Sequence, residues 1–89
     1  MRRTIHFTVH GRVQGVFFRA STKQQADLYG VAGWVRNLRD GKVEGVATAE
    51  ETVLGLFTEW LQRGPELAKV LKVDTRELEF QELEGFEIR

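Results

Sequence analysis

Residues 4–10 alternate between polar and apolar side chains. Ile5, Phe7 and Val9 are apolar, and the residues beside them are threonines and histidines. A period of two is typical of a β-strand with one buried face. We therefore expect a first strand that ends at Gly11.

A helical period replaces this alternation at Phe18. Phe18, Thr22, Ala26 and Tyr29 fall on one stripe of a helix. Gly30 follows, and glycine commonly ends helices. The sequence therefore predicts a first helix over residues 18–29, joined to the first strand by a short loop.

Two more strands come next, joined by the clearest turn in the chain. Residues 31–38 have the pattern of a strand, and the pair Asp40-Gly41 is typical of a tight hairpin. We expect the third strand to end near Ala47.

A second amphipathic helix is predicted after that strand. Residues Thr48 to Glu51 have the form of a capping box, which marks a helix start. Apolar residues then recur at intervals of three and four up to a stop at Gly64-Pro65; they are Val53, Leu56, Phe57, Trp60 and Leu61. We expect this stripe, Trp60 included, to pack against the sheet.

The last third of the chain holds a fourth strand around residues 70–73 and a short extra strand over residues 86–88. The order βαββαβ predicts an α+β fold of the ferredoxin-like type, with two helices on one face of an antiparallel sheet. Right-handed crossovers bring strands one and three together in such a fold. No linker or repeat interrupts the chain, so we expect one domain over residues 1–89.

The composition excludes several chemistries. The chain has 13 Lys and Arg against 13 Asp and Glu, and it has no cysteine. Disulfide frameworks, thiolate metal sites and cysteine nucleophiles are therefore excluded. No apolar run is long enough for a membrane span or a signal peptide, so we expect a cytoplasmic protein without a membrane partner.

The neutral total hides a division of charge along the chain. Residues 1–44 carry a net charge of +5, and residues 45–89 carry −5. A basic half either attracts an anionic partner or pairs with the acidic half, and charge alone leaves both open. We interpret the glutamates between residues 77 and 87 as a solvated edge that keeps late strands from associating.

The connection from the first strand to the first helix has the features of an anion site. Gly11 and Gly15 flank it, and the unsatisfied N–H groups of the loop and the first helical turn suit a tetrahedral oxyanion. Arg19 lies in that turn, where its charge opposes the helix dipole. A bound phosphate explains this position because guanidinium offers two parallel donors, whereas an ordinary surface arginine is the alternative.

A hydrolytic reaction at this loop would have to use water, since no cysteine is present. Asn37 is a candidate to orient that water because a carboxamide both accepts and donates hydrogen bonds. The alternative is a simple strand-end asparagine. His6 and His10 share a strand face without an obvious third ligand, so we expect a polar surface there and no metal site.

Two segments resemble the signatures of the acylphosphatase family. They are Gly11-Arg-Val-Gln-Gly-Val-Phe-Phe-Arg19 and Gly33-Trp-Val-Arg-Asn37, the latter followed by Asp40-Gly41-Lys-Val43. The resemblance implies hydrolysis of an acyl phosphate to a carboxylate and inorganic phosphate, without metal, cofactor or covalent intermediate. It also implies that Arg19 holds the phosphate and Asn37 positions the water. The backbone N–H groups expected to cradle the phosphate are those of Arg12, Val13, Gln14, Gly15 and Val16.

The chain departs from the family's pattern at two places. Ala49 stands where a glycine usually follows the third strand, and no tyrosine follows Arg89. These departures concern the turn before the second helix and the docking of the last strand, and neither touches the expected phosphate site.

Two other classes of function are possible. A non-catalytic anion-binding domain would use the same loop, and it would bind phosphate without turnover. An RNA-recognition module shares the strand order but needs aromatic residues in the RNP1 pattern, which this chain lacks. We therefore expect a small-molecule substrate, no nucleic-acid partner and a monomer.

Overall fold

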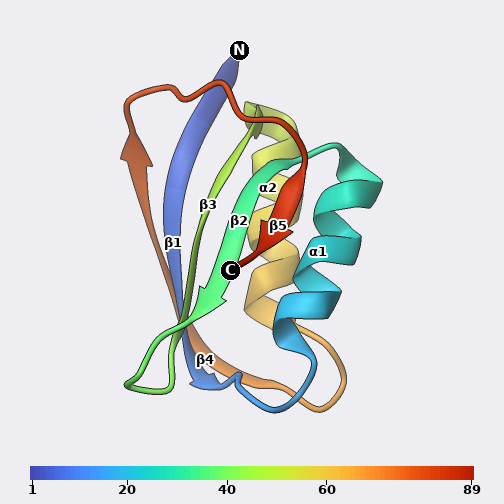
Figure 1. Cartoon of the computed structure of the whole chain (residues 1–89), viewed down its shortest axis with the longest axis vertical. Coiled ribbons are helices and arrows are strands. Elements are labelled where there is room, and N and C mark those ends of the chain that lie inside the picture. Colours follow the sequence, from blue (N-terminus) through green and yellow to red (C-terminus); the bar gives the residue numbers. More distant parts are fainter.

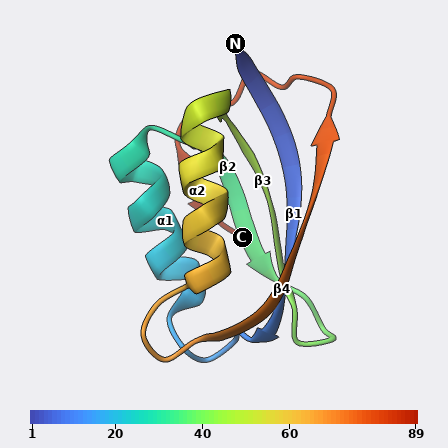
Figure 2. The ribbon, with the colours of Figure 1, turned by 180° about the vertical axis from the view of Figure 1, so that it is seen from behind.

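Two helices cover one face of a five-stranded sheet in the computed structural model, which describes residues 1–89 (Figure 1). The view from behind shows both helices side by side on the same face (Figure 2). In chain order the elements are β1 (Arg2–Arg12), α1 (Phe18–Tyr29), β2 (Ala32–Asn37), β3 (Val43–Glu50), α2 (Glu51–Arg63), β4 (Lys69–Leu78) and β5 (Phe86–Ile88).

The sheet has the strand order β4-β1-β3-β2-β5, and β1 and β3 are adjacent as the topology predicted. The four main strands pair antiparallel, as expected. The short extra strand β5 joins the edge of the sheet and pairs with β2 in parallel, with Val35 opposite Ile88. The chain leaves β4 and crosses one end of the sheet without a helix (Figure 1). A connection of this kind reverses the strand direction, so β5 runs opposite to β4 and therefore along β2.

β1 continues past its predicted end at Gly11. The pairing of β1 with β4 shifts register between His10 and Gly11, so Gly11 lies opposite Val70. Gly11 has a φ of +125°, and a Cβ atom built on it would lie 2.2 Å from the carbonyl oxygen of Lys69. Only glycine fits this bulge, and the glycine expected to end the strand instead lets it continue to Arg12.

The predicted capping box at Thr48 is also wrong. β3 extends to Glu50, opposite Arg2, and the hydroxyl groups of Thr48 and Thr4 form a buried hydrogen bond of 2.7 Å across the strand pair. No side chain caps α2. The strand pairing takes precedence over the local cap because β1 offers partners along the whole of β3. Ala49 consequently lies buried inside β3 and in no turn.

The hydrophobic core lies between the sheet and the helices. Phe57 packs edge-on against Phe7 and against Phe86, with ring centroids 5.8 and 6.0 Å apart, and it therefore joins α2 to β1 and β5. The rings of Trp60 and Phe18 of α1 lie 5.8 Å apart between centroids, so Trp60 packs against the core as expected, but its aromatic contact is with α1. Two residues of the predicted stripes, Tyr29 of α1 and Leu56 of α2, are exposed, and α2 buries Leu54, which was not part of its predicted stripe.

The opposite face of the sheet is polar, as expected for His6 and His10. Each histidine contacts its own carboxylate at 2.9 Å, His6 that of Glu44 and His10 that of Asp74. The structure brings no three histidine or carboxylate groups together in an arrangement that could hold a metal ion. The five glutamates of residues 77–87 are all exposed.

Trp34 lies on this polar face, and its ring is covered by charged groups. The guanidinium carbons of Arg36 and Arg89 lie 5.3 and 5.0 Å from the ring centroid. The cation–π contact of Arg89, which follows β5, helps to attach β5 to β2. Together the two contacts give Trp34 a structural role, separate from the helix-covered face.

Candidate active site

Residues 13–17 connect β1 to α1 at the same end of the sheet as the hairpin between β2 and β3 (Figure 1). Val13 and Val16 are buried in the core cluster. Two apolar anchors in a five-residue connection fix its backbone, although the loop belongs to no helix or strand. The loop is therefore a preformed element.

The backbone N–H groups of this loop have no partner within the chain. The first backbone hydrogen bond of α1 is donated by Ser21 to Phe17 at 3.0 Å, and no backbone or side-chain acceptor takes the N–H groups of residues 14–20. N–H groups without a partner in the chain are satisfied by water or by a ligand, so this run of free donors suits an external acceptor. The loop and the first turn of α1 together present that run.

Two residues in left-handed conformation shape the loop. Gly15 has a φ of 75° and Phe17 has a φ of 64°, and Phe17 is the only non-glycine residue of the chain with positive φ. Alternation of left- and right-handed residues turns successive N–H groups toward one side, which produces an anion-binding concavity. The conformation at Phe17 is strained for an aromatic residue, and such strain is concentrated at functional sites.

The side chain of Gln14 joins the loop to the β2–β3 hairpin. Its Nε2 donates to the carbonyl oxygens of Leu38 and Lys42, at 2.7 and 2.9 Å. The sequence pointed to Gln14 only through its backbone, and no local pattern indicates this long-range contact. The contact holds the loop against the segment that follows Asn37.

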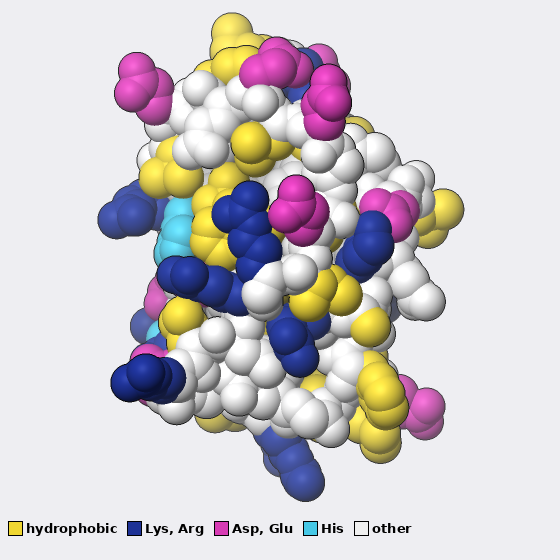
Figure 3. All heavy atoms as spheres, viewed as in Figure 1, with side chains coloured by type: hydrophobic (Ala, Val, Ile, Leu, Met, Phe, Trp, Pro, Cys, Tyr) yellow, Lys and Arg dark blue, Asp and Glu magenta, His cyan; other side chains and the backbone are white.

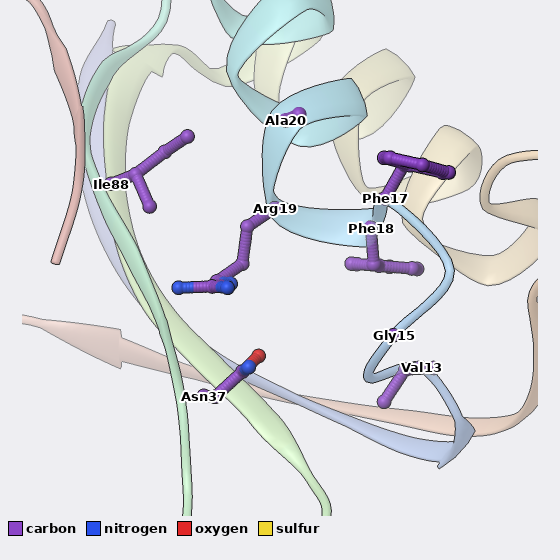
Figure 4. Close-up of a pocket in the computed structure, with 8 residues that line it drawn as sticks. All are labelled: Val13, Gly15, Phe17, Phe18, Arg19, Ala20, Asn37 and Ile88. Atoms are coloured by element: carbon purple, nitrogen blue, oxygen red, sulfur yellow. The ribbon is translucent and has the colours of Figure 1, made fainter.

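Arg19 is the second residue of α1, and it is free of competing partners. Its guanidinium makes no ion pair or hydrogen bond within the chain, and the first turn of α1 contains no acidic residue. The side chain projects into the space between the loop and β2 (Figure 4). Its positive charge therefore lies beside the loop that carries the free N–H groups.

Asn37 is the last residue of β2, and its carboxamide lies across from Arg19 (Figure 4). Its Oδ1 atom is buried and has no hydrogen-bond partner. An orphaned buried acceptor costs free energy, and in native proteins it usually indicates an unseen water or ligand. Asn37 therefore offers an acceptor to a water or other donor in this space.

The turn after Asn37 is held by local hydrogen bonds. Asp40 accepts from the side chain of Lys42 at 2.6 Å and from its backbone N–H at 3.1 Å. These bonds hold the pKa of the Asp40 carboxyl below its ordinary value. The predicted hairpin at Asp40-Gly41 is confirmed, and it keeps the end of β2 in place.

A cavity of about 320 Å³ brings these groups together. Its lining consists of Val13, Gly15, Phe17, Phe18, Arg19, Ala20, Asn37 and Ile88. Four predicted site residues are among them: Val13, Gly15, Arg19 and Asn37. Arg12, Gln14 and Val16 do not line it, and the N–H groups of Gln14 and Val16 have no partner within the chain.

The cavity is electrostatically one-sided. Arg19 is its only charged lining residue, and no carboxylate opposes it. In the view of Figure 1, the surface of the molecule carries several basic side chains, with apolar and acidic side chains among them (Figure 3). The sequence did not indicate that the apolar residues Phe17, Ala20 and Ile88 line the cavity. For Ile88 the reason is that no pattern in the sequence places the terminal strand beside the loop.

The chain is similar to known proteins over nearly its whole length. The family model described as acylphosphatase matches residues 5–88. An acylphosphatase of Nitrosococcus oceani is 49% identical over 91% of each chain, and one of Pseudomonas paraeruginosa is 46% identical over 99% of this chain and 97% of its own.

Solved structures lead to the same family. The structure of an acylphosphatase from Coxiella burnetii superimposes with a TM-score of 0.95 at 42% identity, and the match covers 99% of this chain and 93% of that one. The chain is therefore a member of the acylphosphatase family, whose reaction is the hydrolysis of acyl phosphates.

Proposed function

We propose that the free N–H groups of the loop and Arg19 together bind the phosphoryl group of an acyl phosphate. The run of unpaired donors at residues 14–20 is the observation that carries this proposal. Donors held in place before the substrate arrives need no reorganisation as charge develops on the phosphoryl oxygens. The guanidinium of Arg19 supplies two parallel donors and the only charge in the cavity.

Asn37 positions the attacking water in this proposal. Its buried Oδ1 accepts a hydrogen bond from the water, and its Nδ2 is available to a phosphoryl oxygen. The water oxygen forms a bond to phosphorus while the bond between phosphorus and the acyl oxygen breaks. The carboxylate leaves with the electron pair of that bond, and the proton of the water passes to a phosphate oxygen.

This reaction needs no strong general base or acid from the protein. A carboxylate is a stable leaving group without protonation, so positioning and charge stabilisation supply most of the catalysis. No lining residue other than Arg19 carries a charge, so the cavity has no carboxylate to accept the proton of the water. In this proposal the proton goes to the substrate's own phosphate oxygen. We expect activity without a metal ion or cofactor.

Hydrolysis of acetyl phosphate and benzoyl phosphate in excess EDTA tests the function. We expect turnover of both substrates and competitive inhibition by inorganic phosphate. Hydrolysis in ¹⁸O-labelled water should place the label in phosphate and none in the carboxylate. Phosphate binding without turnover would instead identify a non-catalytic anion-binding domain, and turnover only with added metal would contradict the proposed mechanism.

We further propose that the protein acts as a monomer, as one folding unit over residues 1–89, and without a nucleic-acid partner. The edge strand β4 carries exposed charges at Lys72, Asp74 and Arg76, which disfavours edge-to-edge pairing. Trp34 is engaged by two guanidinium groups and is not free for base stacking. Sedimentation velocity, a single cooperative unfolding transition and RNA filter retention test these three expectations.

The cytoplasmic location stays a prediction. No helix of the structure is long and apolar enough to cross a membrane.

A further inference from the structure

Seven of the 13 Lys and Arg side chains make no ion pair within the chain. They are Arg2, Arg12, Arg19, Arg39, Arg63, Lys69 and Arg76. All but Arg2 and Arg76 lie in or directly beside the three connections at the end of the molecule that holds the β1–α1 loop (Figure 1, Figure 2). The unpaired positive charge is therefore concentrated around the candidate active site.

Contacts between the three connections hold them together at this end. Gln14 of the β1–α1 loop donates to the carbonyl oxygens of Leu38 and Lys42 in the β2–β3 hairpin, at 2.7 and 2.9 Å. Gly64, where α2 gives way to the connection to β4, lies against Phe18, because a Cβ atom built on Gly64 would be 2.9 Å from that ring. Both neighbouring connections therefore pack against the loop or against the first residue of α1.

Three of the unpaired residues lie on these connections outside the cavity, and we term Arg12, Arg39 and Lys69 the basic collar. Arg12 ends β1, and Lys69 lies opposite it at the start of β4. Arg39 lies in the hairpin, two residues after Asn37. All three side chains are exposed, and none of the three residues lines the cavity. The collar therefore adjoins the phosphate site without forming its wall.

The fold supplies no partner for the collar. The other basic residues nearby have one, because Arg63 matches the dipole of α2 and Lys42 pairs with Asp40 at 2.6 Å. The remaining carboxylate of the three connections is that of Glu66, which is exposed and makes no ion pair. Six basic side chains and two carboxylates occupy the segments at this end, which are residues 12–19, 38–42 and 63–69.

The opposite end of the molecule is acidic. Acidic side chains lie near the end that holds the N-terminus, and mainly basic ones lie at the other end (Figure 3). Among the Lys and Arg residues of positions 1–44, only Arg3 pairs with carboxylates of the acidic half, those of Glu51 and Glu77. Pairing between the two halves therefore does not account for the basic half, and an anionic ligand is the alternative that the structure favours.

We propose that the basic collar attracts anionic substrates toward the cavity by long-range electrostatics, without touching the reacting phosphoryl group. This inference rests on the proposed function of the phosphate site. A surface of one sign raises the local concentration of ligands of the opposite sign, and an acyl phosphate is a dianion near neutral pH. The collar should therefore lower both the KM for acyl phosphates and the inhibition constant for inorganic phosphate, and it should leave kcat unchanged.

Charge removal at the collar tests this proposal. The variants are Arg39→Gln, Lys69→Gln and the double variant, and Arg12 is kept because its backbone belongs to the expected phosphate site. Matched controls are Arg2→Gln and Arg76→Gln, which remove exposed, unpaired arginines away from the three connections. The measured quantities are kcat, the KM for acetyl phosphate and the inhibition constant for inorganic phosphate. Each is measured in about 10 mM and about 1 M sodium chloride, where the screening length is about 30 and about 3 Å.

At low salt each single collar variant should raise the KM and the inhibition constant about twofold, and the double variant about fourfold. One unit charge roughly 10 Å from a dianion in water has an effect of this order. At high salt the collar variants and the wild type should agree, because the attraction is screened. The controls should stay within about 1.3-fold of the wild type at both salt concentrations, and kcat should be unchanged in all variants.

A double variant with the wild-type KM at low salt would overturn the collar and leave the phosphate site intact. The same conclusion would follow if the controls weakened phosphate binding as much as the collar variants, or if the effects persisted at high salt. A wild-type protein that hydrolyses no acyl phosphate would instead overturn the proposed function. Calorimetric titration of the same variants with inorganic phosphate would then still test the collar.

Discussion

The two helices differ in the charges near their ends. Neither α1 nor α2 has a side-chain cap. However, α2 has the acidic Glu51 in its first turn and the basic Arg63 in its last, which matches the helix dipole, whereas α1 has neither. The first turn of α1 instead contains Arg19, whose charge opposes the dipole.

This comparison supports the proposal that an anion binds at the start of α1. At the start of α2, the N–H of Glu51 donates to the carbonyl oxygen of Met1 at 3.0 Å, and the Glu51 carboxylate pairs with Arg3 at 2.9 Å. The donors at the start of α1 and the guanidinium of Arg19 have no such partner. A phosphoryl group would supply the negative charge that the first turn of α1 lacks.

The largest effect is expected from Arg19. Arg19→Ala should lower kcat/KM for benzoyl phosphate about 1000-fold, and Arg19→Lys nearly as much, since a single ammonium cannot replace two parallel donors. The measurement is steady-state hydrolysis with excess EDTA. Arg76→Ala, which removes an exposed arginine of β4, is the control and should keep wild-type activity. An Arg19→Ala enzyme within tenfold of the wild type would contradict the proposed phosphate site.

An acidic residue placed at the start of α1 should raise the stability of the protein and weaken its binding of phosphate. Ala20→Glu gives α1 the charge that Glu51 gives α2, and it should raise the free energy of unfolding by about 0.3–1 kcal/mol. The same carboxylate competes with the phosphoryl group, so the inhibition constant for inorganic phosphate should rise about tenfold or more.

Glu51→Gln is the matched change at α2. It should lower stability by a similar amount, part of which comes from the lost pair with Arg3, and it should leave phosphate inhibition unchanged. Denaturant unfolding and inhibition assays measure both effects. If Glu51→Gln weakened phosphate inhibition as much as Ala20→Glu does, the start of α1 would not differ from that of α2 in its link to phosphate binding.

The contact of Gln14 with the hairpin should matter for turnover more than for binding. Gln14→Met keeps the length of the side chain but loses both hydrogen bonds to Leu38 and Lys42. We expect kcat to fall about tenfold because small misplacements of a positioned group are costly, while phosphate inhibition changes little. A parallel loss of kcat and of phosphate binding would show instead that Gln14 only shapes the loop.

The smallest effect concerns stability at low pH on the polar face. The hydrogen bond from His6, with help from Arg36, holds the pKa of Glu44 below its ordinary value near 4.5, and partial burial opposes this shift. The contribution of Glu44 to the free energy of unfolding is therefore complete above pH 4.5. It is lost as the pH falls through the lowered pKa of the folded state.

Glu44→Gln should flatten this part of the stability profile without changing activity at neutral pH. Denaturant unfolding between pH 3 and 7 measures the difference between the two proteins. If the difference in unfolding free energy between the wild type and Glu44→Gln did not shrink toward low pH, the ionised Glu44 carboxylate would not be the source of this stability.

The sequence predicted the elements whose patterns are local. The helix α1 with buried Phe18, Thr22 and Ala26, its stop at Gly30 and the hairpin at Asp40-Gly41 are present in the structure. The convergence of Arg19 and Asn37 was expected from the two signature segments, and both residues line the same cavity.

What the sequence could not predict depends on distant partners. The extended β3 follows from its pairing with Arg2 and Arg3 at the far end of β1, and that pairing overrides the capping box at Thr48. Likewise, the contacts of Gln14 and the position of Ile88 arise from chain segments far away in sequence. A pattern within one segment carries no information on such contacts.

The kcat of Asn37→Ala, measured beside its inhibition constant for inorganic phosphate, tests the central claim most directly. If the loop and Arg19 bind the phosphoryl group while Asn37 only positions the water, kcat should fall about 100-fold and the inhibition constant should stay within about threefold of the wild type. A variant that keeps its kcat, or that loses phosphate binding to the same extent as turnover, would contradict this division of roles.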